Sequence, residues 1–305
     1  MLRKILKVVL WLVVAALVLL GVQTWRYWDT IQRVFLGGVD VYETTPPSLP
    51  AELKRPAILV FSKTNAFRHG EAIPAANALF AKMANDNGWG YFQTENAATF
   101  SPAILSRFDA VVFNNVSGDV FTPDQRAAFK AFVENGGGYL GIHAAGDNSH
   151  AAWDWYMKAI LGTTFTQHTM SPQFQSATVK VEDKEHAATQ GLPASWQHVE
   201  EWYSFDVSPR KTGAHVLLTV DESTYNPVGM FGKDLRMGDH PMAWSRCVGK
   251  GRVLYTAFGH RAEAFAEPEI RMLLRNATEW VLHSDGGDCI GSAIKNDDAG
   301  RGEER

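Results

Sequence analysis

Three consecutive glycines precede a short apolar segment, and a histidine follows this segment directly. Gly136, Gly137 and Gly138 can end a helix, because glycine adopts positive φ angles without a steric penalty. Residues 139–142 are short and apolar, as in a parallel strand that is buried on both faces. In open α/β sheets, ligands bind beyond the carboxyl ends of the strands. His143 follows this segment directly and is therefore predicted to lie at a functional edge of the sheet.

Strand-like and helix-like segments alternate through the first half of the chain. Such alternation is typical of a doubly wound, mostly parallel sheet, so the predicted fold class is a flavodoxin-like α/β domain. The second half is less regular, with further strands before a last amphipathic helix. The predicted strands are 57–62, 89–94, 109–115, 139–142, 175–182, 214–220, 242–246 and 252–257, and the main predicted helices are 71–87, 122–135 and 267–283.

The N-terminal residues 1–28 differ in kind from the rest of the chain. Basic residues precede an apolar stretch, and the 18 uncharged residues from Val8 to Trp25 would span about 27 Å as a helix, close to the thickness of a bilayer core. This pattern favours a transmembrane signal anchor, with a cleaved signal peptide as the main alternative. The basic flank predicts a single-pass protein of the bacterial inner membrane, whose folded domain lies on the periplasmic side.

The chain divides into an anchor (1–28), a linker (29–56), an α/β domain (57–283) and a polar tail (284–305) that is predicted to be disordered. A net charge of −4 and a pI near 6.2 give no electrostatic sign of nucleic-acid binding. Cys247 and Cys289 could pair or remain free, and no CxxC motif is present. The oligomeric state is left open.

From about Ala57 to His283 the chain resembles the trehalose-utilisation (ThuA-like) family. The resemblance rests on a series of short motifs in a fixed order. They are Thr64-x-x-Phe67-Arg68-His69, residues 136–143, Phe165-x-x-His168, Glu185-His186, Glu200-Glu201-Trp202-Tyr203, Pro241-Met-Ala-Trp244, Gly249-Lys-Gly-Arg-Val253 and Gly259-His260.

The resemblance implies a class I glutamine-amidotransferase-like fold and a link to sugar or keto-sugar metabolism, with a divalent metal as a cofactor candidate. Glutamine amidotransferases carry a nucleophilic cysteine at the turn where this chain has His143. Neither Cys247 nor Cys289 is near that turn in the sequence. A cysteine-dependent amidotransferase reaction is therefore excluded.

Histidines and a glutamate in the expected loops form the predicted centre. Imidazole and carboxylate groups are the usual ligands of zinc, which is the first metal candidate, and they can also relay protons near neutral pH. Of the adjacent Glu200 and Glu201, one is expected to reach the pocket and the other to meet solvent. The predicted catalytic residues are His69, His143, Glu201 and His260, the predicted metal ligands are His69, His143, His168 and His260, and the predicted substrate contacts are Arg68, Asn114, Asn115, Trp202 and Tyr203.

Each of these residues also has a structural interpretation. A histidine at the end of a strand can simply bond a neighbouring loop, the two asparagines can cap a turn, and the aromatic residues can belong to the core. The leading functional prediction is an enzyme that processes a small-molecule carbohydrate, either a disaccharide or a keto-glycoside. The alternative is a non-catalytic sugar-binding or scaffold module on the same fold.

Overall fold

A nine-stranded mixed sheet forms the centre of the domain, with the strand order β2-β1-β3-β4-β11-β10-β9-β6-β7. β5 and β8 form a separate two-stranded sheet. The structure is a computed structural model that describes residues 2–282. The strands are β1 Ala57–Phe61, β2 Gly90–Thr94, β3 Ala110–Asn114, β4 Gly138–Ile142, β5 Phe165–His168, β6 Phe174–Val181, β7 Ser195–Glu201, β8 Tyr203–Phe205, β9 His215–Val220, β10 Pro241–Val248 and β11 Gly251–Thr256. The α-helices are α1 Leu2–Arg26, α2 Trp28–Phe35, α3 Ala72–Asn87, α4 Pro102–Leu105, α5 Pro123–Glu134 and α6 Pro268–Val281.

The first half of the sheet is parallel, as the sequence predicts. β2, β1, β3, β4 and β11 run in the same direction, and β1, β3 and β4 are buried along their whole length. The carboxyl ends of these strands therefore share one edge. The α/β fold class is confirmed, and the structure adds an antiparallel half that extends from β11 through β10, β9 and β6 to β7.

Helices cover both faces of the sheet. Adjacent residues of a strand point to opposite faces, and the end of β3 shows what each face meets. The Phe113 ring packs on Phe129 of α5, with ring centroids 5.1 Å apart. The next side chain, Asn114, donates instead to the carbonyl oxygen of Ile73 in α3, 3.0 Å away. α3 and α5 thus lie on opposite sides of the sheet.

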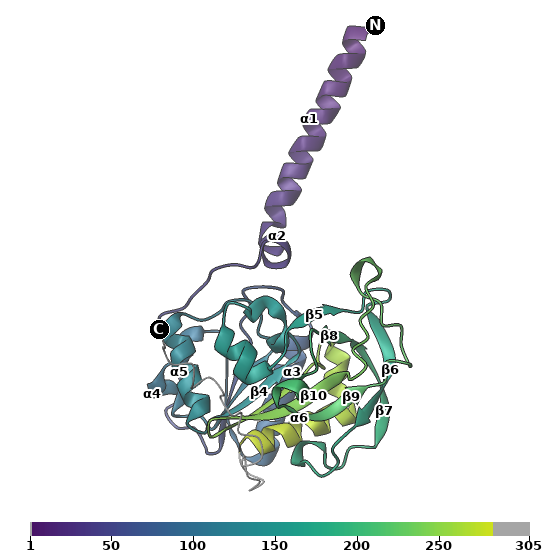
Figure 1. Cartoon of the computed structure of the whole chain (residues 1–305). Coiled ribbons are helices and arrows are strands. Elements are labelled where there is room, and N and C mark those ends of the chain that lie inside the picture. Colours follow the sequence, from purple (N-terminus) through teal and green to yellow (C-terminus); the bar gives the residue numbers. More distant parts are fainter. Residues whose placement is uncertain (1, 283–305) are drawn as a thin grey trace, which may run out of the picture.

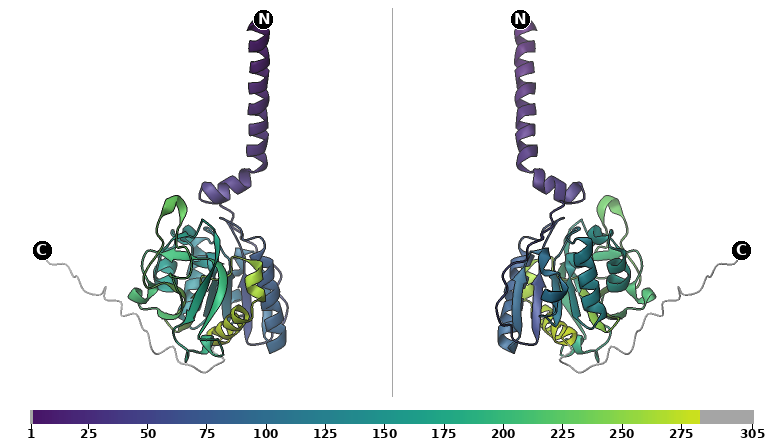
Figure 2. Two further views of the ribbon diagram at one scale, coloured as in Figure 1. Left: turned by 90° about the vertical axis from the view of Figure 1, so that its right-hand side faces the viewer. Right: turned by 90° about the vertical axis from the view of Figure 1, so that its left-hand side faces the viewer.

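The N-terminal segment differs from a simple linker. α2 begins at Trp28, occupies the start of the predicted linker 29–56 and follows α1 almost directly (Figures 1 and 2). The rest of the segment is bonded to the domain: the Val39 amide donates to the carbonyl oxygen of Asn65 (2.7 Å), and the Gln125 side chain donates to that of Glu43 (2.8 Å). The predicted tail 284–305, Cys289 and His283 lie outside the described residues.

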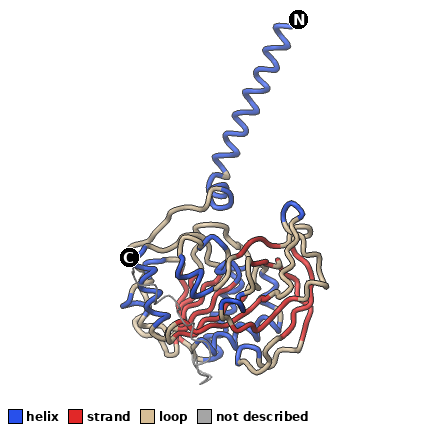
Figure 3. Tube along the Cα trace, viewed as in Figure 1, coloured by secondary structure: helices blue, strands red, loops and turns tan. Residues whose placement is uncertain are grey.

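α1 has the length and composition of a membrane span. The candidate span Arg3–Arg26 contains an 18-residue window with a mean hydropathy of 2.8, and none of that window is buried. An anchor and a signal sequence share these properties. Figure 3 shows the helix extending away from the domain.

Candidate functional site

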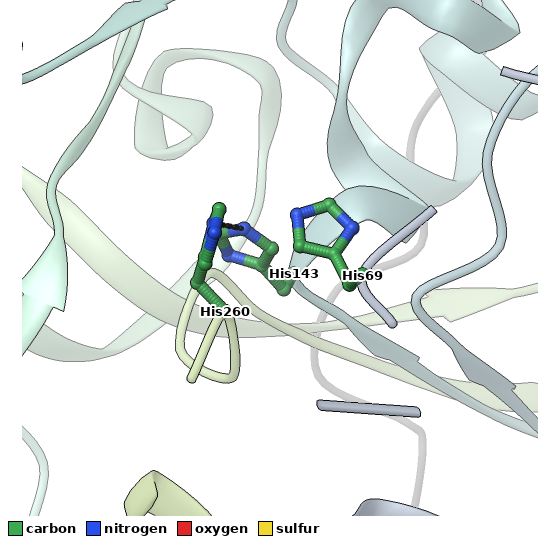
Figure 4. Close-up of side chains that lie close together, drawn as sticks. All are labelled: His69, His143 and His260. Carbon is green, nitrogen blue, oxygen red and sulfur yellow. Dashed lines mark hydrogen bonds between the residues drawn. The ribbon is translucent and has the colours of Figure 1, made fainter. Parts of the chain in front are cut away.

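Three histidines from three separate loops meet at the carboxyl edge of the parallel strands (Figure 4). His143 follows β4 directly and has a positive φ of 49°, which turns the chain sharply at the end of the strand. His69 lies between β1 and α3, and His260 follows β11. Because β1 and β11 lie on either side of the β3–β4 pair, the sheet order brings these loops together.

The three rings are close enough to share one ion. Nε2 of His143 lies 3.1 Å from Nδ1 of His260. The His69 ring centroid lies 4.8 Å from that of His143 and 4.5 Å from that of His260. One ligand atom from each residue can be chosen so that all three lie within 4.8 Å of one another. The structure thus brings together three of the four predicted metal ligands.

The backbone fixes which nitrogen of His143 is available. Its Nδ1 lies 2.8 Å from the carbonyl oxygen of Ala257. A carbonyl oxygen can only accept a hydrogen bond, so Nδ1 carries the proton in the neutral ring. The lone pair is then on Nε2, the nitrogen that faces His260. This is the arrangement in which a backbone carbonyl orients a metal-binding imidazole.

Glu201, at the end of β7, connects this group to His168. One of its carboxylate oxygens, Oε2, lies 3.0 Å from Nδ1 of His260 and 3.5 Å from Nε2 of His143. The other, Oε1, lies 3.1 Å from Nδ1 of His168 and also accepts a hydrogen bond from Gln173. His168 therefore lies on the far side of Glu201, outside the group of three histidines.

The charges of the site are set by burial and by these contacts. Burial, together with the nearby His143 and His260, holds the pKa of His69 well below its usual value, so this ring is neutral. Burial opposes ionisation of Glu201, but its interactions with His143 and His260 outweigh burial and lower the pKa. For His143 burial also opposes the charge, yet the carboxylates of Glu201 and Glu200 raise the pKa.

The expectation that one of the two adjacent glutamates meets solvent is wrong. The two side chains do point to different surroundings, but both are buried. Glu200 accepts a hydrogen bond from the Gly259 amide (2.7 Å), and its Oε2 lies 3.5 Å from Nε2 of His198. Glu200 therefore holds the loop that carries His260. Alternation along a strand predicts the face to which each side chain points, but it does not predict which residues cover that face.

His198 provides a pH-dependent contribution to stability. Burial disfavours its charged form, but Glu200 and Glu267 outweigh burial and raise its pKa to about 9. Since the unfolded value is about 6.5, this stabilisation is complete below about pH 6.5 and is lost as the pH rises through about 9. We expect the free energy of unfolding, measured by urea titration, to fall by up to about 3 kcal/mol over this range. His198→Gln should remove most of that slope, and an unchanged slope in this variant would contradict the assignment.

Most of the residues that were predicted to contact the substrate have structural roles instead. Trp202 is a core residue with 0% exposure, whose Nε1 donates to the carbonyl oxygen of Gln175 (2.8 Å). Asn114 is buried and bonded to α3, and Asn115 donates to Asn114 and to the carbonyl oxygen of Gly259. Arg68 makes a bidentate contact with Glu95 at the surface. These four therefore have structural partners.

Tyr203 does belong to the site. Its ring centroid lies 4.3 Å from that of His143 and 4.3 Å from that of Phe165. Burial raises the pKa of its hydroxyl well above the usual value, so the ring stays neutral. Tyr203 packs against the imidazole that the Ala257 carbonyl orients.

Two exposed phenylalanines lie beside His260 and were not predicted as site residues from the sequence. Phe67 and Phe174 have exposed fractions of 45% and 37%, and their ring centroids lie 6.4 Å and 5.0 Å from that of His260. Phe67 also packs edge-on against His69, at 4.9 Å. Phe67 belongs to the Thr64-x-x-Phe67-Arg68-His69 motif, and this motif could have indicated that Phe67 lies near the site. No motif in the sequence indicated the position of Phe174.

Comparisons with known proteins agree with this architecture. Residues 57–281 match the family model named ThuA and described as trehalose utilisation. A crystal structure of a putative ThuA-like protein from Bacteroides uniformis is 29% identical, with a TM-score of 0.66 over 80% of this chain and 99% of that one. A second, from Parabacteroides merdae, is 18% identical, with a TM-score of 0.56 over 76% of this chain and 91% of that one, and supports the fold alone. No curated protein matches the chain.

Proposed function

The chain belongs to the ThuA family, and we propose that it is a membrane-anchored enzyme that processes a carbohydrate at the three-histidine site. The family description, trehalose utilisation, supports a sugar as the substrate class. A disaccharide or a keto-glycoside fits a site that combines polar groups with two exposed aromatic rings. α1 is the proposed anchor, and the basic residues Arg3, Lys4 and Lys7 favour a cytoplasmic N-terminus with the domain on the periplasmic side.

The proposal depends mainly on the surroundings of the His69 side chain. Nδ1 of His69 is buried and has no hydrogen-bond partner among the described residues. An unpartnered buried imidazole is costly unless it binds something. A neutral ring beside two other imidazoles is the donor set that zinc prefers.

The geometry fits a divalent metal ion after a small adjustment. Zn–N bonds of about 2.0–2.1 Å in a tetrahedron place the nitrogen atoms about 3.3 Å apart. The 3.1 Å between Nε2 of His143 and Nδ1 of His260 is already close to that value. The chosen ligand atom of His69 lies within 4.8 Å of the others and would have to approach them by up to about 1.5 Å. We assign His69, His143 and His260 as the proposed ligands.

The bound metal would polarise a carbonyl or hydroxyl oxygen of the sugar. The residues around it have separate tasks. Glu201 is ionised and its carboxylate lies 3.0 Å from Nδ1 of His260, so it would stabilise the positive charge of a bound metal. The Ala257 carbonyl holds His143 in the ligating tautomer. The alternative, a sugar-binding module without catalysis, would use the same opening without turnover.

Aromatic rings at the opening provide a direct test of the sugar site. Phe67→Ala and Phe174→Ala should each weaken carbohydrate binding by about threefold to tenfold, because stacking of an apolar sugar face on a ring contributes about 0.5–1.5 kcal/mol. Both rings are partly exposed, so the melting temperature should change little. Binding of disaccharides and keto-glycosides by the full-length protein can be measured by calorimetry, and turnover by chromatography.

Phe35→Ala is the matched control, because Phe35 is an exposed phenylalanine on α2. If both site variants bind every sugar as tightly as this control, the opening beside His260 does not bind the substrate. Binding without turnover would favour the non-catalytic alternative.

A further inference from the structure

A group of exposed apolar side chains lies at one end of the molecule. Besides those of α1, it includes residues of α2, its flanking residues and the loop that contains Met230–Gly232. Figures 1 and 2 show this loop rising from the domain to the level of α2, at the end that faces α1. The turn at the tip of the loop is the blue segment at the upper right of the domain in Figure 3. The exposed large residues at this end are Trp25, Tyr27, Trp28, Phe35, Leu36, Met230 and Phe231.

α2 lies across the axis of α1, between α1 and the domain (Figure 2). Its polar side contacts the domain: Nη1 of Arg33 donates to the carbonyl oxygen of Thr64, 2.5 Å away, and Nε of Arg33 bonds Asp29 (2.8 Å). Trp28 and Phe35 are exposed instead. A short helix with aromatic residues on its outer side, directly after a span, is typical of one that lies in the bilayer interface.

The loop around Phe231 is held in an unfavourable backbone conformation. Phe231 has a φ of 59°, which costs a residue with a side chain roughly 1–2 kcal/mol, and its side chain is 98% exposed. The bonds Gly229 N–Lys233 O (2.9 Å) and Met230 N–Gln167 Oε1 (3.0 Å) fix the turn and tie it to β5. Among the described residues nothing packs on this ring. A fixed, fully exposed phenylalanine indicates a partner outside the chain.

The histidine site lies at this same end. Thr64, which Arg33 contacts, belongs to the loop that carries His69. A cavity of about 420 Å³ lies between α2 and this loop, and its lining includes Arg33, Thr64 and Phe67. β5, to which the Phe231 loop is bonded, ends at His168. The carboxyl edge of the sheet therefore faces α1.

We propose that this end of the domain rests on the surface of a phospholipid bilayer, with α2 and Phe231 inserted at the boundary between headgroups and acyl chains. The proposal rests on the proposed membrane anchoring by α1, since the span fixes which end of the domain meets the membrane. Trp28, Phe35 and Phe231 supply the aromatic contacts that favour the interface, and Lys233 beside Phe231 can meet lipid phosphates. The histidine site then opens next to the membrane, where it would meet saccharides held at the lipid surface.

The test uses the full-length protein in vesicles of phosphatidylcholine and phosphatidylglycerol. The environment-sensitive fluorescent amino acid Anap is introduced singly at three positions: Phe231→Anap at the loop, Lys250→Anap as the matched control, and Leu12→Anap in α1. Lys250 is exposed in the turn before β11, at the opposite edge of the sheet from the histidines. Emission is then quenched by lipids that carry a nitroxide near the headgroup, and separately by aqueous iodide.

We expect the nitroxide lipid to remove about half or more of the emission at position 231 and to leave the emission at position 250 unchanged. Iodide should quench the emission at position 250 and leave that at position 231 unchanged. If position 12 is quenched by the lipid while 231 and 250 respond equally to iodide, the docking proposal is overturned and the anchor stands. If position 12 is also open to iodide, the proposed anchoring fails, and the docking proposal fails with it.

Discussion

Replacing His143 and His260 together by alanine should abolish metal binding. The double variant removes two of the three proposed ligands, including the pair whose nitrogen atoms lie 3.1 Å apart. His69 alone is a weak monodentate site. Since changing even an outer-shell partner of a metal typically costs 10-fold to 100-fold in affinity, the loss of two ligands should exceed about 100-fold. Elemental analysis of the dialysed full-length protein, followed by a competitive zinc titration, measures the effect.

Two further variants make this result interpretable. His215→Ala is the control, because His215 is an exposed histidine that pairs with Asp183 (2.7 Å), outside the site. It should retain the metal. His260→Ala alone removes one proposed ligand and leaves the buried His143 in place, and its melting temperature shows whether the fold persists. Metal retained at the wild-type level by the double variant would refute the three-histidine site.

Trp202→Ala should destabilise the domain by about 3–5 kcal/mol, which is a large fraction of the stability of a domain this size. The indole is completely buried, and its ring centroid lies 5.6 Å from that of Tyr225 and 6.3 Å from that of Phe258. Alanine would leave a cavity and would remove the hydrogen bond to the carbonyl oxygen of Gln175. Chemical unfolding followed by far-ultraviolet circular dichroism measures the change.

The matched control is Trp28→Ala, since Trp28 is exposed on α2 and outside the domain core. Its unfolding transition should coincide with that of the wild type. This pair of variants separates the core role of Trp202 from the sugar contact that the sequence suggested. A Trp202→Ala protein with normal stability and weakened sugar binding would show that the core assignment is wrong.

Local patterns in the sequence were enough to place most of the secondary structure. β1 and β3 are short apolar runs that match the predicted strands closely, and α5 follows Thr122, where the predicted helix 122–135 begins. The Thr122 side chain accepts a hydrogen bond from the Gln125 amide, and the Gln125 side chain accepts one from the Thr122 amide. These features depend on residues that are only a few positions apart, so they can be predicted without knowledge of the tertiary structure.

Other features were hidden because they depend on contacts between distant segments. β5, β7 and β8 were not predicted, and neither was α2 within the supposed linker. Glu200 and Trp202 looked like surface or substrate residues, yet β6, the loop at Gly259 and the ring of Phe258 cover them. Polarity alone could not reveal this, because a buried charge is tolerated wherever the fold supplies partners.

The sequence by itself determined that His143 ends a buried parallel strand, since the glycine break and the apolar run are properties of neighbouring residues. It also determined the family and the apolar N-terminal helix. Only the tertiary structure decided that His69, His143 and His260 meet, that Glu201 joins them and that His168 does not. Strand order and register set those distances, and they result from packing the whole sheet between its helices, which no local stretch of sequence specifies.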